Sequence, residues 1–181
     1  MPMAEGVRRR VWLYPTAFVA IAAFLVVLRL LPLGLRAGAW PGPDLLLCLI
    51  LAWVIRRPDY LPAPLMAVVL LLEDLLLMRP PGLWAALVLV ATEFLRSRAA
   101  LTRELSFPVE WLLVSGVMLA LRFAERTIAA LALLPQPALG EHLLQTAMTI
   151  LCYPLIVGCC WLLLDLRKPA TGELDAFGRR M

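Results

Sequence analysis

The sequence has few of the residues from which enzymes build their active sites. Its 181 residues include one histidine and three serines, and no serine has the partners of a catalytic triad around it. It contains no HExxH, no phosphate-binding loop, no GxSxG and no paired DxxD motif. We therefore expect no catalytic residue, no cofactor and no metal ion, and we interpret the chain as a non-enzymatic protein.

Cysteine is also scarce, and its pattern is not that of a disulfide framework or a zinc site. Each of the four cysteines lies inside an apolar run, where a thiol behaves as a small hydrophobic side chain. We expect all of them to be buried; they are Cys48, Cys152, Cys159 and Cys160.

Long hydrophilic stretches are absent as well. The chain is 62% hydrophobic with a mean hydropathy of +0.86, against about 45–50% apolar residues in ordinary soluble domains. Because the excess recurs along the whole length, we predict an all-α, polytopic transmembrane helical bundle. A single transmembrane domain covers residues 1–181, with a short cytoplasmic tail over 167–181. The first apolar run is too long for a cleavable signal peptide, so we interpret it as the first span.

Six apolar segments separated by proline, glycine and arginine predict about six spans. They cover residues 11–33, 44–55, 61–78, 82–95, 109–134 and 141–166. A full crossing needs roughly 20 residues at about 1.5 Å each, which the first, fifth and sixth segments provide. The second and fourth are short, so we expect thinned crossings, flanking by the interfacial tryptophans Trp40 and Trp53, or partly re-entrant segments.

The basic residues alternate with these segments in a way that predicts orientation. Twelve fall on one side of the predicted membrane and only Arg36 and Arg79 on the other, which follows the positive-inside rule. Both termini and the loop before Pro108 are therefore predicted to be cytoplasmic. Contact with anionic lipid explains the basic side, and we expect no nucleic-acid binding. The twelve are Arg8, Arg9, Arg10, Arg56, Arg57, Arg96, Arg98, Arg103, Arg167, Lys168, Arg179 and Arg180.

Ionisable residues at membrane depth are candidates for a functional site. Glu73 and Asp74 of the third segment lie at about the same depth as Arg122 and Arg126 of the fifth. We predict that one of these carboxylates pairs with one of these arginines across the two helices. Glu125 is the competing partner, because it lies three residues from Arg122 on the same helix. These charges either hold helices together or line a cavity or partner surface.

Two further charged residues lie near the predicted outer face. Asp44 follows Pro43 at the start of the second segment, where a carboxylate can cap a helix N-terminus; a partner-binding role is the alternative. Arg29 lies toward the outer end of the first segment, and we expect its side chain to extend to the membrane interface.

Two stretches carry a resemblance to a known family. They are PDLLLCLILAW at residues 43–53 and DLLLMRPPGLWAAL at residues 74–87. With the chain length and six short spans, they resemble the MreD family, small membrane proteins of the bacterial rod-shape system. Pro81 directly precedes Gly82 where Leu-Gly is common in the family, and Glu73 adds a second acid. The resemblance assigns motif positions to Pro43, Asp44, Asp74 and Gly82.

The resemblance implies a non-enzymatic scaffold in the inner membrane of a bacterium. Such proteins work with MreC, with RodA and with its class B penicillin-binding transpeptidase in lateral peptidoglycan synthesis, and MreB is linked to the same assembly. The motif positions would shape a surface or cavity for partner helices. The fold would be similar to the substrate-binding subunits of energy-coupling-factor transporters.

That architecture leaves a second hypothesis open, a solute-binding transmembrane subunit of a transporter. It requires a pocket at the outer face with several polar and aromatic contacts. The candidates near that face are Trp40, Asp44, Arg79, Trp84, Gln136 and Gln145.

Overall fold

The computed structural model describes residues 2–31, 42–99, 102, 105–136 and 138–164, with the side chains of the first helix described from residue 13. Trp40 and the predicted tail over 167–181 lie outside the described residues. Within them the chain forms six α-helices and one 3₁₀-helix and no strand. The elements are α1 (Pro2–Leu30), α2 (Leu45–Arg56), η1 (Pro58–Tyr60), α3 (Ala63–Leu76), α4 (Leu83–Ser97), α6 (Phe107–Leu131) and α7 (Leu139–Leu164).

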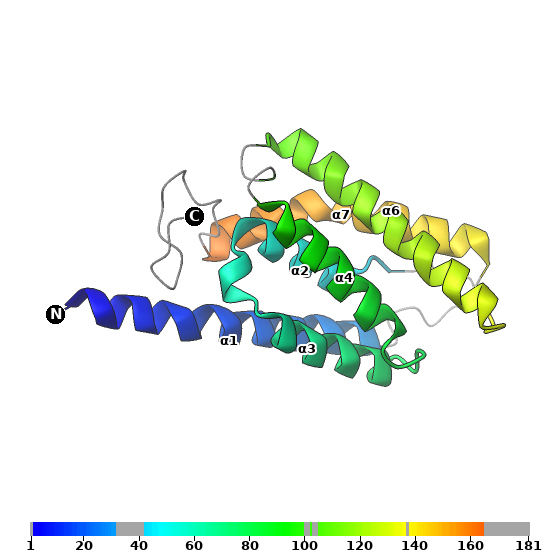
Figure 1. Cartoon of the computed structure of the whole chain (residues 1–181), viewed down its shortest axis with the longest axis horizontal. Helices are drawn as coiled ribbons and strands as arrows, with labels where there is room; N and C mark the ends of the chain where they lie inside the picture. The colour runs from blue at the N-terminus through cyan, green and yellow to red at the C-terminus, as the bar shows by residue number, and fades with distance from the viewer. Residues whose placement is uncertain (1, 32–41, 100–101, 103–104, 137, 165–181) are drawn as a thin grey trace.

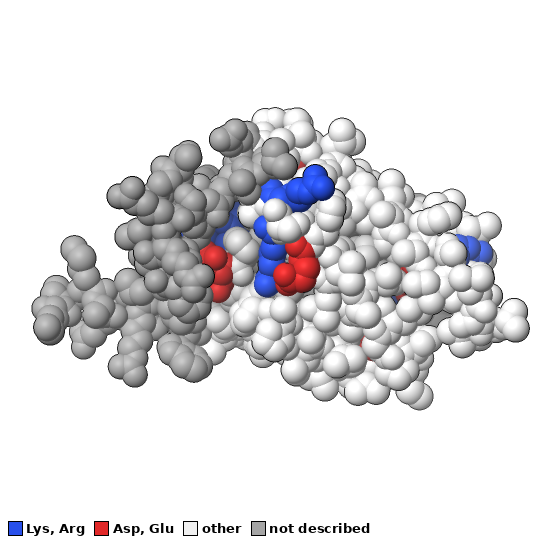
Figure 2. Space-filling view, in the orientation of Figure 1, with Lys and Arg blue, Asp and Glu red and all other residues white. Residues whose placement is uncertain are grey.

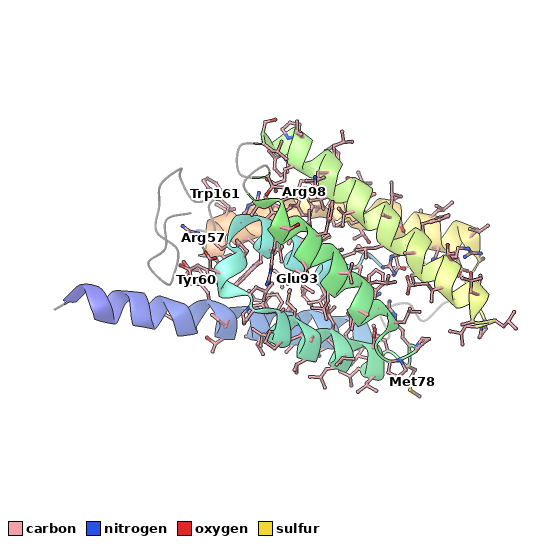
Figure 3. All side chains as sticks on the ribbon, viewed as in Figure 1. Arg57, Tyr60, Met78, Glu93, Arg98 and Trp161 are labelled. Carbon is pink, nitrogen blue, oxygen red and sulfur yellow. The ribbon has the colours of Figure 1, made fainter. Side chains whose placement is uncertain are left out.

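Successive helices run in opposite directions along the long axis of the molecule (Figure 1). One end, here called the η1 end, holds η1, the last turn of α4 and the first turn of α6. Arg57, Tyr60, Arg98 and Trp161 lie there (Figure 3). The opposite end, here called the turn end, holds the α3–α4 turn with Met78 and the residues that join α6 to α7 (Figures 1 and 3).

The helix bounds lie within three residues of the predicted segments, except at the start of the first. α1 begins at Pro2, well before residue 11, and α3 is only 14 residues long. Pro62 adopts an extended conformation and Pro64 occupies the first turn, so α3 cannot begin before Ala63. Three helical stretches, Leu13–Leu30, Phe107–Leu131 and Leu139–Leu164, are long and apolar enough to cross a membrane, as predicted for the first, fifth and sixth segments.

The short helix α2 is the centre of the bundle. All of its residues except Leu45 are buried, and it packs against α7, α4 and α1. Trp53 is fully buried between Phe18, at 5.3 Å between ring centroids, and Tyr14, at 6.3 Å. The prediction that Trp53 is interfacial is therefore wrong: its ring fills the core. A 12-residue helix spans only about 18 Å, and α2 is surrounded along that length by protein.

The outer surface is apolar, as expected where lipid replaces water. Leu112, Phe123, Leu162 and Leu163 are each at least 74% exposed. A soluble monomer rarely exposes so much contiguous apolar area. On the face shown in Figure 2 most of the described surface carries no charge, and most of the charged atoms gather nearer the η1 end. The fold is that of a helical membrane protein.

Burial of the cysteines follows the prediction only in part. All four thiols are free; Cys48 and Cys160 are buried, Cys152 is half-buried and Cys159 is exposed. Adjacent residues of a helix point in different directions, so Cys159 and Cys160 cannot both face the core.

Candidate functional site at the turn end

Asp44 caps α2 and is fully buried. Its Oδ1 accepts a hydrogen bond from the Leu47 backbone N–H at 3.2 Å, which confirms the predicted cap. Its own backbone N–H donates to the Thr149 hydroxyl oxygen of α7 at 2.9 Å. The start of α2 is thereby fixed to α7, next to the Gln145 side chain, which donates to the Gly42 carbonyl at 3.1 Å.

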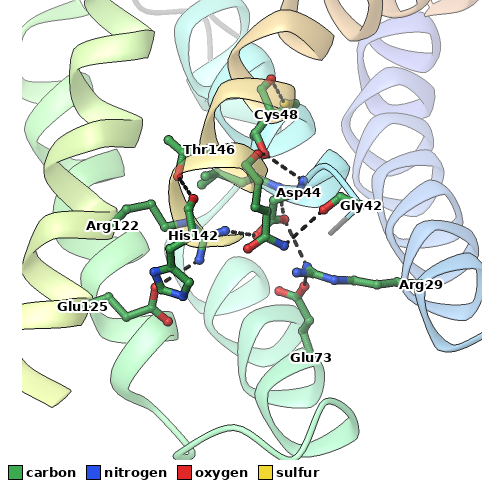
Figure 4. A network of polar contacts seen from close by, with 12 residues as sticks. Arg29, Gly42, Asp44, Cys48, Glu73, Arg122, Glu125, His142 and Thr146 are labelled. Atoms are coloured by element: carbon green, nitrogen blue, oxygen red, sulfur yellow. Dashed lines mark hydrogen bonds and ion pairs between the residues drawn. The ribbon is translucent and has the colours of Figure 1, made fainter. Parts of the chain in front are cut away.

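The same carboxylate binds two arginines from different helices (Figure 4). Arg122 of α6 places Nη2 2.9 Å from Oδ2, and Arg29 of α1 places Nη1 3.3 Å from Oδ1. Each arginine then binds one more carboxylate: Arg29 Nη1 lies 2.7 Å from Glu73 Oε1, and Arg122 Nη1 lies 3.0 Å from Glu125 Oε2. We call this series, from Glu73 through Arg29, Asp44 and Arg122 to Glu125, the ion-pair chain.

The ion-pair chain corrects two predictions. Glu73 pairs with Arg29 rather than with an arginine of α6, and Arg122 pairs with Asp44 and, as the competing hypothesis proposed, with Glu125. Matching depth was not enough, because α3 packs against α4 and α1 while α6 packs against α4 and α7. Arg29 does not extend to the interface either: its side chain is 22% exposed and points inward at two carboxylates.

Asp74 has a different role from its neighbour Glu73. Its Oδ2 accepts the backbone N–H groups of Gly82 at 3.0 Å and Ala85 at 3.3 Å. Asp74 therefore caps α4 from across the α3–α4 turn, which explains why an aspartate and a glycine are spaced eight residues apart. Gly82 has φ of 89°, in the left-handed region that glycine adopts without strain. The predicted pairing of Asp74 with Arg122 or Arg126 is wrong.

Trp84 of α4 contacts two arginines. The Arg122 guanidinium lies 4.2 Å from the centroid of the Trp84 ring, and the Arg79 guanidinium lies 5.8 Å from it. The ring is 1% exposed, so these cation–π contacts are shielded from solvent. Arg79 makes no ion pair with any described residue, and its buried Nη1 has no hydrogen-bond partner among them.

A pocket of about 330 Å³ opens beside this site at the turn end. Its wall comes from the α3–α4 turn, the last turns of α6 and the first turns of α7. Arg126 lines it, and the Arg126 backbone carbonyl accepts the Gln136 side-chain amide at 3.0 Å. The pocket thus brings together several of the predicted polar residues, whereas Asp44 and Trp84 are buried behind it. Its basic and amide side chains are Arg79, Arg122, Arg126, Gln136, His142 and Gln145.

A second buried network lies at the η1 end, and the sequence reasoning did not find it. Arg56 Nη1 lies 2.7 Å from Glu110 Oε1, and the Tyr153 hydroxyl donates to the same oxygen at 2.8 Å. All three side chains are buried. Arg56 ends the second segment and Glu110 opens the fifth, so their shared depth was the available signal.

The site consists of structural ion pairs, helix caps and one open pocket. Over the described part of the chain, no three His, Cys, Asp or Glu side chains are placed to hold a metal ion. The fold defines the class of protein, a helical membrane protein with buried charges at both ends of its central helix. The chain matches no protein-family model, no curated protein and no solved structure.

Proposed function

We propose that this chain is a non-enzymatic scaffold of the bacterial rod complex, similar in role to MreD. In this proposal it spans the inner membrane six times and contacts MreC, RodA and a class B penicillin-binding transpeptidase, with MreB linked through the assembly. The proposal starts from the resemblance over residues 43–53 and 74–87.

One observation carries the proposal furthest. Three motif positions, Asp44 and the pair Asp74 and Gly82 about 30 residues later, fix the backbone where helices meet at the turn end. Asp44 and Asp74 are fully buried, so neither carboxylate reaches a substrate. Residues used in this way favour a rigid surface for partner helices over catalysis.

The proposed orientation places the η1 end in the cytoplasm. Arg57 and Arg98, both in the predicted cytoplasmic set, lie at that end (Figure 3), and Arg79 lies at the turn end. A division of basic residues between the two ends supports an orientation set by the positive-inside rule. Cysteine labelling of Leu133→Cys and Arg98→Cys in intact cells tests it. Access from the same side of the membrane at both positions contradicts the proposal.

Co-purification tests the proposed partners. An affinity-tagged chain is expected to bring down MreC and the wall synthases from mild detergent, and depletion is expected to turn rod-shaped cells round. The matched control is Glu93→Gln, which alters an exposed residue of α4 and is expected to recover the same partners. Recovery of none of them from wild type, with cell shape intact on depletion, contradicts the scaffold.

The pocket favours one alternative, a solute-binding transmembrane subunit of a transporter. Arg79, Gln136 and Gln145, three of the candidates for such a site, line it together. In that case ATPase subunits are expected to co-purify, and depletion is expected to create a nutrient requirement without a change of shape. The two proposals therefore differ in both measurements.

A further inference from the structure

The strongest unexplained feature of the turn end is the Arg79 guanidinium. It forms no ion pair with a described carboxylate, although the charges of Asp44 and Glu73 act on it from nearby, and its Nη1 is buried without an acceptor. The residue is partly exposed, but a buried donor atom without an acceptor is costly, and native structures rarely retain one without a reason. Trp84 contacts the guanidinium and limits its freedom, so the donor is already held in place at the pocket wall.

The charges of the pocket wall favour an anion. Arg79, Arg122 and Arg126 line it with two carboxylates, Glu125 and Glu141. Glu125 is bound by Arg122, and Glu141 is exposed at the rim. Unlike Arg122, Arg79 forms no ion pair with a described carboxylate, and a guanidinium fork matches a phosphate or carboxylate oxygen pair. The volume of about 330 Å³ is within the usual range for small ligands.

The position of the pocket relative to the bilayer and the apolar residues at its rim favour a membrane lipid as the source of that anion. The pocket lies where α6 ends and α7 begins, and the ends of long apolar helices lie at the headgroup level of a bilayer. Met78, which is 93% exposed, and Leu134 form part of its rim, and Leu133 beside them is 92% exposed. Apolar side chains at the rim are suited to acyl chains, and the arginines inside are suited to the phosphate.

We propose that the turn-end pocket binds the phosphate group of a membrane lipid, with Arg79 as its principal hydrogen-bond donor. Arg126 and the Gln145 amide are the second and third contacts. The proposal holds whichever side of the membrane the turn end faces, and it does not rest on the proposed function.

Native mass spectrometry of the full chain tests the proposal. Detergent-purified protein is titrated with phosphatidylglycerol, with phosphatidylcholine and with inorganic phosphate, and thermal unfolding is measured in parallel. Wild type is expected to retain phosphatidylglycerol. Arg79→Gln is expected to lower the affinity for this lipid by about tenfold or more, because one charge-assisted contact is lost. Arg79→Lys is expected to fall between them.

The matched control is Arg98→Gln, the same substitution at an exposed arginine of the η1 end. It is expected to bind like wild type. Equal loss in Arg79→Gln and Arg98→Gln, or no retention by wild type, overturns the proposal. If inorganic phosphate raises the unfolding temperature but no lipid is retained, the pocket binds a soluble phosphate, and the proposal of a lipid ligand is overturned. Arg79 forms no ion pair with a described residue, so Arg79→Gln is expected to unfold close to the wild-type temperature.

Discussion

At the η1 end of α2, Arg56 binds Glu110, which also accepts the Tyr153 hydroxyl. At the turn end, Asp44 binds Arg29 and Arg122. The two arrangements share one cause. A short helix inside the bundle has ends that cannot reach water, so each end is met by a buried ion. The signs suit the helix dipole, with a carboxylate at the N-terminus of α2 and a guanidinium at its C-terminus.

The networks at the two ends differ in how many of their buried polar atoms have a hydrogen-bond partner. At the turn end three buried polar atoms lack a partner among the described residues, namely Glu73 Oε2, Asp74 Oδ1 and Arg79 Nη1. At the η1 end, Arg56, Glu110 and Tyr153 contribute no such atom, but Arg96 Nε in the last turn of α4 does, and so does Trp53 Nε1 one turn before Arg56. We infer that the network of Arg56, Glu110 and Tyr153 is a closed structural clamp, whereas the ion-pair chain and its neighbours at the turn end keep capacity for a ligand or partner.

The largest effect is expected from Asp44→Ala. Two buried arginines would lose their shared carboxylate, and breaking a buried pair from one side costs about 3–5 kcal/mol. The free energy of unfolding is measured by SDS titration in mixed micelles with tryptophan fluorescence. A loss below about 1 kcal/mol would show that the ion-pair chain does not stabilise the fold.

Glu110→Gln is expected to cost less, about 1.5–3 kcal/mol in the same titration. The amide can still accept a hydrogen bond from Arg56, so only the charge-assisted part of the contact is lost. Asp44→Asn is the matched isosteric change at the other end and is expected to cost more, because Asp44 serves two arginines. The reverse order would contradict our comparison of the two ends.

Asp74→Ala is expected to cost about 1–2 kcal/mol, the usual range for loss of a helix cap. The Gly82 and Ala85 N–H groups would lose their acceptor. Asp74→Asn keeps one carbonyl oxygen and serves as the control, with a smaller loss expected. Equal stability of Asp74→Ala and wild type would exclude a capping role.

A double-mutant cycle separates the observed pairing from the one predicted by depth. Arg29→Gln with Glu73→Gln is expected to show a coupling energy of about 1 kcal/mol, because the two side chains are in contact. Glu73→Gln with Arg122→Gln is expected to couple by less than about 0.5 kcal/mol. Stronger coupling in the second cycle would restore the depth-based pairing.

The smallest effect is expected from Glu93→Gln. Glu93 is 54% exposed and pairs with Arg96 on the same helix at 3.1 Å. Such pairs contribute about 0.3–0.5 kcal/mol. The unfolding free energy should stay within that margin of wild type, and a larger change would mean that this pair is shielded from water.

Much of the secondary structure could be predicted because the residues that begin and end helices act locally. Asp44 fixes the start of α2, and Gly82 with its positive φ fixes the start of α4. The partners of the charges could not be predicted in the same way. Residue spacing gives depth along a helix but not which helix lies beside it. For that reason Arg29 was expected at the interface, whereas its side chain binds Glu73.

The sequence by itself determined that apolar helices dominate, where most of them begin and end, and that Glu125 lies within reach of Arg122. These follow from composition, helical period and turn chemistry, which act over a few residues. Only the tertiary structure decided that α2 is almost completely buried whereas the similarly short α3 is not. It also decided that Trp53 belongs to the core and that the Asp44 carboxylate joins α1 to α6 through Arg29 and Arg122. Contacts between distant segments depend on how helices are ordered around α2, and a pattern along one helix carries no information about its neighbours.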